Sequence, residues 1–225
     1  MEPITGNLLA INQQIAHAAR DAGRDPDEIT LIAASKTQPG TVIQQAYEAG
    51  IRHFGENYLD EALAKRADLA TPDLIWHFIG KIQSNKTKSI AQHFDWVHTI
   101  DRYKIAKRLS DQRSGSKLNA LIQVNIDADP AKGGVRKEEV ASLVEQIDPL
   151  PNLSLRGLMT ILDRTSDPAS SYQSMAQLFT ETRAYLNSTA RWDTLSMGMS
   201  GDMAQAIGAG ATQVRIGTAL FGPRS

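Results

Sequence analysis

The chain of 225 residues contains no cysteine. This absence excludes disulfide bonds, thiolate-bound metals and a cysteine nucleophile together. Carboxylate clusters with metal-ligand spacing are missing too, and the histidines other than His77 are scattered singly, at His17, His53, His93 and His98. We therefore expect no bound metal.

Long apolar runs and an excess of charge are also lacking. No apolar stretch approaches the roughly 20 residues that span a bilayer, and the start of the chain lacks the basic and apolar regions of a signal peptide. The 24 Lys and Arg nearly balance the 25 Asp and Glu. We therefore expect a cytoplasmic protein that binds neither a membrane nor nucleic acid, and we interpret the cluster of Lys81, Lys86 and Lys88 as a solvated rim.

Apolar runs and amphipathic stretches alternate along the chain. The apolar runs, each a predicted strand, are Thr30–Ala34, Ile51–Phe54, Leu74–Phe78, Trp96–Thr99, Leu118–Asn125, Leu155–Met159, Thr194–Ser196 and Gln213–Arg215. The predicted helices are Asn7–Ala22, Val42–Ala49, Asn57–Ala67, Arg102–Asp111, Lys137–Ile147, Ala169–Asn187 and Asp202–Ile207. This alternation, without a Pro/Gly/Ser-rich linker, predicts a single α/β domain over residues 1–225, a (β/α) TIM barrel preceded by an extra N-terminal helix.

A lysine follows the first predicted strand. The strand Thr30–Ala34 is followed by Ser35, Lys36 and Thr37, before the Pro39-Gly40 breaker. The carboxyl ends of parallel strands are where ligands bind in such folds, and an amine that is partly desolvated there can condense with an aldehyde. Lys36 is therefore a candidate for holding a carbonyl ligand.

Two short turns near the end of the chain have the composition of a phosphate site. Ser200 and Gly201 stand before a predicted helix, and Gly217 and Thr218 follow the last predicted strand. Glycine allows the backbone to approach a ligand closely, and hydroxyl and N–H groups at helix starts favour an anion. A phosphate cradle together with Lys36 indicates pyridoxal 5'-phosphate (PLP) as the cofactor. Nothing in the sequence matches the fingerprints of nucleotide or dinucleotide binding.

Several ordered blocks resemble the pyridoxal phosphate homeostasis protein family, whose fold is similar to the barrel domain of bacterial alanine racemase. The blocks are Ala34-Ser35-Lys36-Thr37, His53-Phe54-Gly55-Glu56-Asn57-Tyr58, Trp76-His77-Phe78-Ile79-Gly80-Lys81-Ile82-Gln83-Ser84-Asn85-Lys86, Val124-Asn125-Ile126-Asp127, Arg156-Gly157-Leu158-Met159-Thr160-Ile161 and the two C-terminal turns. They run along nearly the whole chain.

The resemblance implies roles for particular residues. Lys36 would form a Schiff base with the PLP aldehyde, and Arg215 would face the pyridine nitrogen. Asn57 would reach a polar edge of the ring, and Met159 would pack against its face. His77 is open to two interpretations, a contact with the cofactor or a histidine satisfied within the core.

Two neighbours of these residues are interpreted differently. We expect Glu56 and Asp202 to act as turn or cap residues rather than as catalytic acids.

The resemblance also implies a function in PLP (vitamin B6) homeostasis rather than in catalysis. Alanine racemase uses a second base from a further domain, and we expect no such domain here, because Ser225 follows closely on the last predicted barrel unit. We expect a monomeric carrier that holds PLP and delivers it to PLP-dependent apoenzymes. The alternative is a slow single-domain amino-acid racemase, for which Tyr58 and His77 are the local candidates for a second base.

Overall fold

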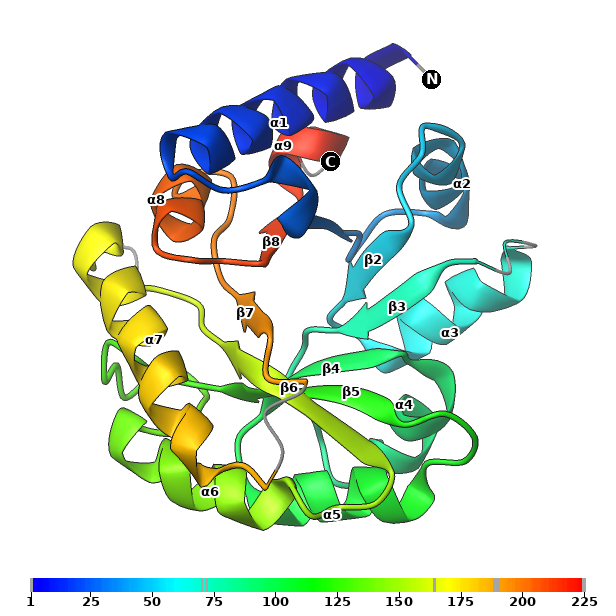
Figure 1. Cartoon of the computed structure of the whole chain (residues 1–225). Helices are drawn as coiled ribbons and strands as arrows, with labels where there is room; N and C mark the ends of the chain where they lie inside the picture. Colours follow the sequence, from blue (N-terminus) through cyan, green and yellow to red (C-terminus); the bar gives the residue numbers. More distant parts are fainter. Residues whose placement is uncertain (1, 70, 72, 164, 188–190, 224–225) are drawn as a thin grey trace.

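The computed structural model describes residues 2–69, 71, 73–163, 165–187 and 191–223 (Figure 1). Eight parallel strands close into a barrel, in which each strand pairs with the next and the last pairs with the first. The strands are β1 (Thr30–Ala34), β2 (His53–Glu56), β3 (Ile75–Phe78), β4 (Trp96–Ile100), β5 (Leu118–Gln123), β6 (Leu153–Met159), β7 (Thr194–Ser196) and β8 (Gln213–Ile216). The predicted (β/α) barrel is confirmed.

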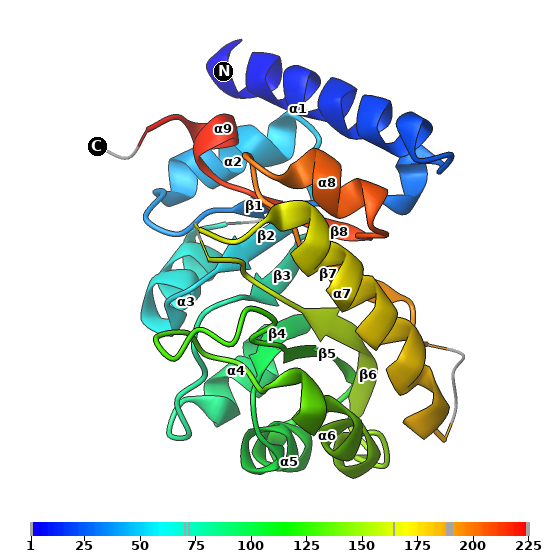
Figure 2. The same ribbon diagram turned by 90° about the vertical axis from the view of Figure 1, so that its left-hand side faces the viewer.

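Helices cover the outside of the barrel (Figures 1 and 2). The α-helices are α1 (Glu2–Asp21), α2 (Gly40–Glu48), α3 (Leu59–Asp68), α4 (Thr87–His93), α5 (Tyr103–Gln112), α6 (Val140–Ile147), α7 (Pro168–Thr182), α8 (Met203–Gly208) and α9 (Thr218–Phe221). Short 3-10 helices are η1 (Pro26–Glu28), η2 (Lys137–Glu139) and η3 (Arg183–Tyr185). None of the helices in the described ranges combines the length and apolar character that crossing a membrane requires.

The N-terminal helix packs on the last barrel units. Both ribbon views show α1 beside α8 and α9 (Figures 1 and 2). Ile11, Ile15 and Ala19 recur at a spacing of four and are buried, which is the apolar stripe that predicts this helix. The Asn7 side-chain amide donates to the Leu220 carbonyl at 2.9 Å, so α1 is fixed to the segment that follows β8. The predicted extra helix is present and begins earlier than expected.

Strand β2 differs most from its prediction. It was expected over Ile51–Phe54 and runs over His53–Glu56, because Gly55 and Glu56 pair with His77 and Phe78 of β3. A glycine followed by a glutamate resembles a turn in the sequence, yet both residues are buried here. The shift carries the carboxyl end of β2 two residues further along the chain and places Asn57 at its exit.

Candidate functional site at the carboxyl ends of the strands

Lys36 and the last turn line one small cavity. The cavity has a volume of about 50 Å³ and is lined by Ala34, Lys36, Gln38, Gly217, Thr218, Phe221 and Gly222. Lys36 is only partly exposed, and within the described residues no hydrogen bond or ion pair engages its Nζ atom. The structure thus brings together three of the predicted site residues, from opposite ends of the chain, because β1 and β8 are neighbours in the closed barrel.

The loop that carries Lys36 is held in a constrained conformation. Thr37 has a φ of 66°, a left-handed conformation that is unfavourable for a β-branched residue. Its N–H donates to Glu61 Oε1 at 2.6 Å, and Ser35 is fixed by its hydroxyl, which donates to Glu56 Oε1 at 2.6 Å. The residues on both sides of Lys36 are therefore tied to carboxylates of β2 and α3.

A buried ion pair supports this loop. Lys65 of α3 places its Nζ 2.8 Å from Glu56 Oε1 and donates to the Ser35 carbonyl at 2.8 Å. It also pairs with Glu61. Glu56 is thus neither a turn nor a cap residue as expected, but a fully buried strand residue. Burial raises the pKa of Glu56, and the bonds from Lys65 and Ser35 oppose that rise.

The second predicted turn lies next to the first. Ser200 and Gly201 are exposed and precede α8, which begins at Met203, one residue later than predicted. Asp202 stabilises the turn, since its Oδ1 accepts from the Met199 N–H at 2.6 Å. The Gly198 carbonyl accepts from the Arg215 N–H at 3.0 Å, which links this turn to β8. The two phosphate-type turns therefore belong to adjacent strands and end at the same edge of the barrel.

Arg215 is buried inside the barrel with only 5% of its surface exposed. Its Nη1 donates to Ser196 Oγ at 2.7 Å and its Nη2 donates to the Thr160 carbonyl at 2.7 Å. Burial lowers the pKa of the guanidinium to about 10, and the acidic groups of Tyr172 and Asp202 oppose this shift. Even so, the group stays cationic at neutral pH and can only donate.

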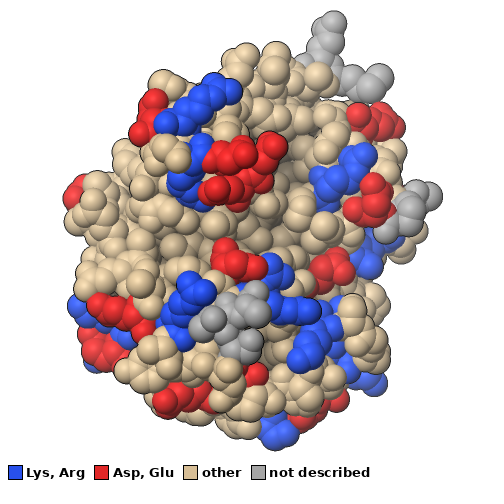
Figure 3. Space-filling model, in the orientation of Figure 1, with Lys and Arg blue, Asp and Glu red and all other residues tan. Residues whose placement is uncertain are grey.

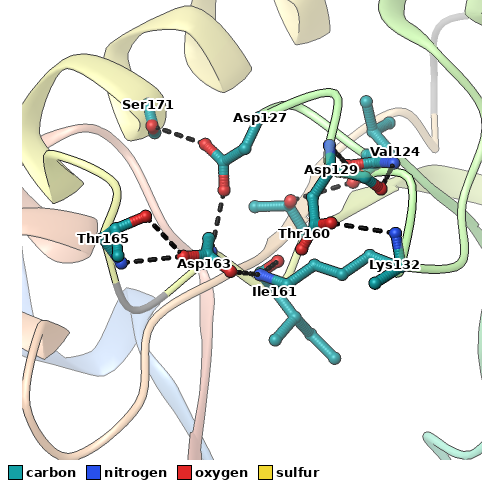
Figure 4. Close-up of polar contacts among 11 residues, drawn as sticks. Val124, Asp127, Asp129, Lys132, Thr160, Ile161, Asp163, Thr165 and Ser171 are labelled. Atoms are coloured by element: carbon teal, nitrogen blue, oxygen red, sulfur yellow. Dashed lines mark hydrogen bonds and ion pairs between the residues drawn. The ribbon is translucent and has the colours of Figure 1, made fainter.

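The Thr160 carbonyl, which accepts the hydrogen bond from Arg215, lies where the loops after β5 and β6 meet. Figure 4 shows Asp127, after β5, accepting from the Asp163 N–H and from the Ser171 hydroxyl, each at 2.8 Å. The Thr160 hydroxyl donates to the Val124 carbonyl at 2.9 Å. These contacts tie the loops after β5 and β6 to each other and fix the segment that carries the Thr160 carbonyl.

Asn57 follows β2 and lies against the next loop. Its Oδ1 is buried and has no hydrogen-bond partner among the described residues. A Cβ added at Gly80 would lie 2.0 Å from the Asn57 carbonyl oxygen, so glycine is needed where these loops touch. An unpaired buried amide oxygen is costly unless a ligand supplies a donor, and this makes Asn57 a credible ligand contact.

His77 and Met159 lie deeper in the barrel. Met159 is fully buried in a small interior cluster with Trp96 and Leu121. His77 is fully buried as well, and its two ring nitrogens lie 2.9 Å from nitrogens of His53 and His98. This arrangement favours the second of the two interpretations, a histidine satisfied within the core. Direct contact of either residue with a cofactor stays a prediction.

Basic and acidic side chains are interspersed over the face drawn in Figure 3. In the rim that contains Lys81, Lys86 and Lys88, the Lys86 Nζ pairs with both carboxylate oxygens of Asp60 at 3.0 Å. Neutralised pairs of this kind give no strong field of one sign.

Sequence reasoning missed Ser196, Thr160 and Lys65. Ser196 and Thr160 stand at the carboxyl ends of two adjacent strands, which is a usable signal for groups that face the mouth of a barrel. Lys65 follows Leu59 and Ala62 at a spacing of three, and all three are buried. A lysine on the apolar face of a predicted helix calls for a buried acidic partner, and Glu56 is that partner.

Comparison with known proteins identifies the family of the chain. A family model described as the N-terminal domain of alanine racemase matches residues 7–225. A pyridoxal phosphate homeostasis protein of Pseudomonas aeruginosa is 50% identical over 226 residues, which cover 100% of this chain and 97% of that protein. The protein of the same name from Escherichia coli K12 is 45% identical over 229 residues, covering 100% of this chain and 98% of its own length.

Solved structures agree with the barrel. PipY of Synechococcus elongatus, in a structure with PLP bound, is 33% identical with a TM-score of 0.84, covering 97% of this chain and 99% of that one. Alanine racemase from Corynebacterium glutamicum, at 17% identity and a TM-score of 0.67, shares the fold over 95% of this chain and 60% of its own. The resemblance seen in the sequence is confirmed: the chain belongs to the pyridoxal phosphate homeostasis protein family and has the barrel of the N-terminal domain of alanine racemase.

Proposed function

We propose that this protein binds PLP through Lys36 and serves PLP homeostasis in the cytoplasm. One observation carries the proposal: the Lys36 amine, which has no polar partner among the described residues, shares a cavity with Gly217 and Thr218. The amine would attack the aldehyde carbon of PLP, a C=N bond would form and one water molecule would leave. Because this Schiff base hydrolyses by the reverse step, the link stores the cofactor without consuming it.

The size and donors of the cavity fit a phosphate group. A water molecule needs about 10–15 Å³ in such a cavity. The cavity volume of about 50 Å³ is several times that, so the cavity would accommodate a group of the size of a phosphate. Ser200 and Gly201 of the adjacent turn and the Thr218 hydroxyl would supply further donors. Asn57, whose Oδ1 has no partner in the part of the chain that the structure describes, would accept from the ligand.

Arg215 argues for storage rather than catalysis. As a donor without an acceptor site, a guanidinium at the pyridine nitrogen keeps that nitrogen unprotonated. An unprotonated ring is a weaker electron sink, so carbanion chemistry on bound PLP would be slow. Met159 and His77 would support the site from within the barrel.

The two candidates for the second base, His77 and Tyr58, are poorly placed for racemisation. His77 is fully buried and both of its nitrogens face other histidines. Tyr58 is 60% exposed, and its side chain reaches no buried position from which it could act as a base. Tyr58 and Asn57 both line a pocket other than the Lys36 cavity. These positions argue against racemisation, and the relatives are named pyridoxal phosphate homeostasis proteins. We therefore propose a carrier that holds PLP, acts as a monomer and releases the cofactor to apoenzymes.

The experiment compares wild type with Lys36→Ala. Purified protein is titrated with PLP while its absorbance spectrum and bound cofactor are followed. We expect a visible Schiff-base band in the wild type and none in Lys36→Ala. Prolonged incubation with L-alanine and L-serine, followed by chiral chromatography, tests the alternative. Racemisation well above that of free PLP and abolished by Lys36→Ala would overturn the carrier function.

A further inference from the structure

A continuous row of polar side chains runs through the barrel interior, from its amino-terminal mouth to Arg215. The row begins at His53, whose Nδ1 lies 2.9 Å from His77 Nε2. His77 Nδ1 lies 2.9 Å from His98 Nε2, and His98 Nδ1 lies 3.0 Å from Ser196 Oγ. Ser196 Oγ then accepts from Arg215. Five residues from five different strands therefore connect the two ends of the barrel.

The row does not form a metal site in the part of the chain that the structure describes. There, no group of three His, Cys, Asp or Glu side chains could hold a metal ion, and both ring nitrogens of His77 are engaged by the neighbouring histidines. His77 also stacks on Trp96, with ring centroids 5.5 Å apart and planes at 15°. The rings are thus held edge to edge by hydrogen bonds and packing rather than by an ion.

Donor and acceptor chemistry gives the row a direction. Arg215 can only donate, so Ser196 Oγ accepts from it, and the serine hydrogen needs an acceptor. Among the described residues, the other polar partner of this oxygen is His98 Nδ1. A neutral His98 that accepts at Nδ1 carries its hydrogen on Nε2 and donates to His77, which in turn donates to His53. The opposite direction would leave the serine hydrogen without a partner.

We propose that Ser196, His98, His77 and His53 form a one-way hydrogen-bond relay that positions Arg215. Through this relay, the hydrogen bonding of the Arg215 guanidinium depends on conditions at the amino-terminal mouth of the barrel. The relay's effect on a bound cofactor rests on the proposed function, in which Arg215 faces the PLP ring nitrogen. The four residues are positioning residues, since they act through Arg215.

The far end of the relay opens on a pocket of about 410 Å³. The pocket lies at the amino ends of the strands and is lined by Glu28, Thr30, His53, Trp96, Arg156, Asp193, Thr194, Thr212 and Gln213. In the relay's direction the hydrogen of neutral His53 is on Nε2, since Nδ1 accepts from His77, and His53 itself lines this pocket. Solvent or a solute there therefore contacts the last member of the relay.

Protonation of His53 conflicts with the relay. An imidazolium has a hydrogen on Nδ1, which would face the hydrogen on His77 Nε2. Burial lowers the pKa of His53, and the nearby Asp95 carboxylate opposes that shift. His77 faces the ring directly, and Glu28, Arg156 and Asp193 are the other charged groups that line the same pocket as His53. Acidification that protonates His53 must break or reverse the relay, and on reversal Ser196 Oγ would face two donors.

The direction of the relay is tested without any cofactor. Long-range ¹H–¹⁵N correlation spectra of histidine-labelled protein at pH 7 report which ring nitrogen carries the hydrogen. We expect neutral His77 and His98 with the hydrogen on Nε2. In Ser196→Ala, His98 Nδ1 loses its donor, and we expect its hydrogen to move partly to Nδ1. Hydrogens on Nδ1 in the wild type, a charged ring in either residue, or a pattern unchanged by Ser196→Ala would overturn the relay.

The coupling to the cofactor is tested by pH titration of the PLP-loaded protein. We expect the absorbance spectrum of the wild type to change in a transition below the usual histidine pKa of about 6.5. His53→Gln keeps an acceptor for His77 but does not titrate, so this transition should be lost. The same transition in both proteins, or none in the wild type, contradicts the coupling. Failure to bind PLP at any pH would instead refute the proposed function and leave the NMR result standing.

Discussion

Lys65 Nζ lies 2.8 Å from Glu56 Oε1 and 2.8 Å from the carbonyl oxygen of Ser35, the residue directly before Lys36. The Lys65 side chain is 7% exposed and the Glu56 side chain is completely buried. An ion pair in such a place brings little net stability compared with apolar residues, because both charges lose their water. Its value here is geometric: it joins the ends of β1 and β2 under the loop that presents Lys36.

Removing one partner of this pair should be costly. Lys65→Met leaves the Glu56 carboxylate buried without its cation, which typically destabilises a protein by about 3–5 kcal/mol. Lys107→Met is the matched control, because Lys107 pairs with Asp111 four residues later on the surface of α5. An exposed helical pair of this kind is screened by solvent and contributes little to stability. Urea unfolding measures both changes, and equal losses for the two variants would contradict the geometry.

Gly157→Ala should distort β6 and the Thr160 segment that follows it. Gly157 has a φ of 150°, and an added Cβ would lie 1.9 Å from the Thr194 carbonyl oxygen of β7. Overpacking of this kind costs about 1–3 kcal/mol or more. Gly208→Ala, at the last residue of α8, is the control, since nothing lies within 4 Å of the added atom and the change should cost no stability. Thermal melting that ranks the two variants the other way would refute the packing described at β6.

Stability should fall in acid because of the buried histidines. Burial holds the pKa of His77 and His98 well below 6.5. Below pH 6.5 the unfolded chain therefore binds more protons than the folded one. Stability is fully present above that pH and is lost as the pH falls, by up to about 1.4 kcal/mol per pH unit for each histidine.

Urea unfolding at a series of pH values measures this slope. His98→Asn should reduce it, whereas His17→Gln, at a position whose side chain is 80% exposed, should leave it unchanged. A slope that does not respond to His98→Asn would show that other groups cause the loss of stability in acid.

The Thr218 hydroxyl should contribute to phosphate binding. Thr218→Val keeps the size of the side chain and removes the donor, and a hydrogen bond to a charged group is worth about 1.5–3 kcal/mol. We therefore expect PLP affinity to fall roughly 10- to 150-fold. Pyridoxal, which lacks the phosphate, is the control ligand and should bind both proteins equally. An equal loss for both ligands would argue that Thr218 shapes the site without contacting phosphate.

Local pattern predicted much of the barrel. Thr30–Ala34 and Thr194–Ser196 are strands over the predicted residues, because runs of buried apolar side chains with clear breaks specify them directly. The same breaks mark the ends of the strands, so the sequence also indicates which candidate site residues stand at the carboxyl ends. Lys36, Gly217 and Thr218 needed only the closure of the barrel to meet.

Polar contacts between residues far apart in the chain could not be predicted from the local sequence pattern. Gly55 and Glu56 belong to β2 only because β3 pairs with them and Lys65 neutralises the carboxylate nine residues away. His77 and His98 stand 21 residues apart, and nothing in the sequence around either shows that their rings touch. Such contacts depend on strand register, which a single sequence specifies only weakly.

Chemical trapping of the bound cofactor tests the central claim most directly. The protein is incubated with PLP, treated with borohydride to reduce the C=N bond, digested and examined by peptide mass spectrometry. We expect the reduced cofactor on Lys36 and not on the nearby Lys65, whose amine is buried in its ion pair. Modification of another lysine in the wild type, or none at all, would contradict the account of Lys36 as the residue that holds PLP.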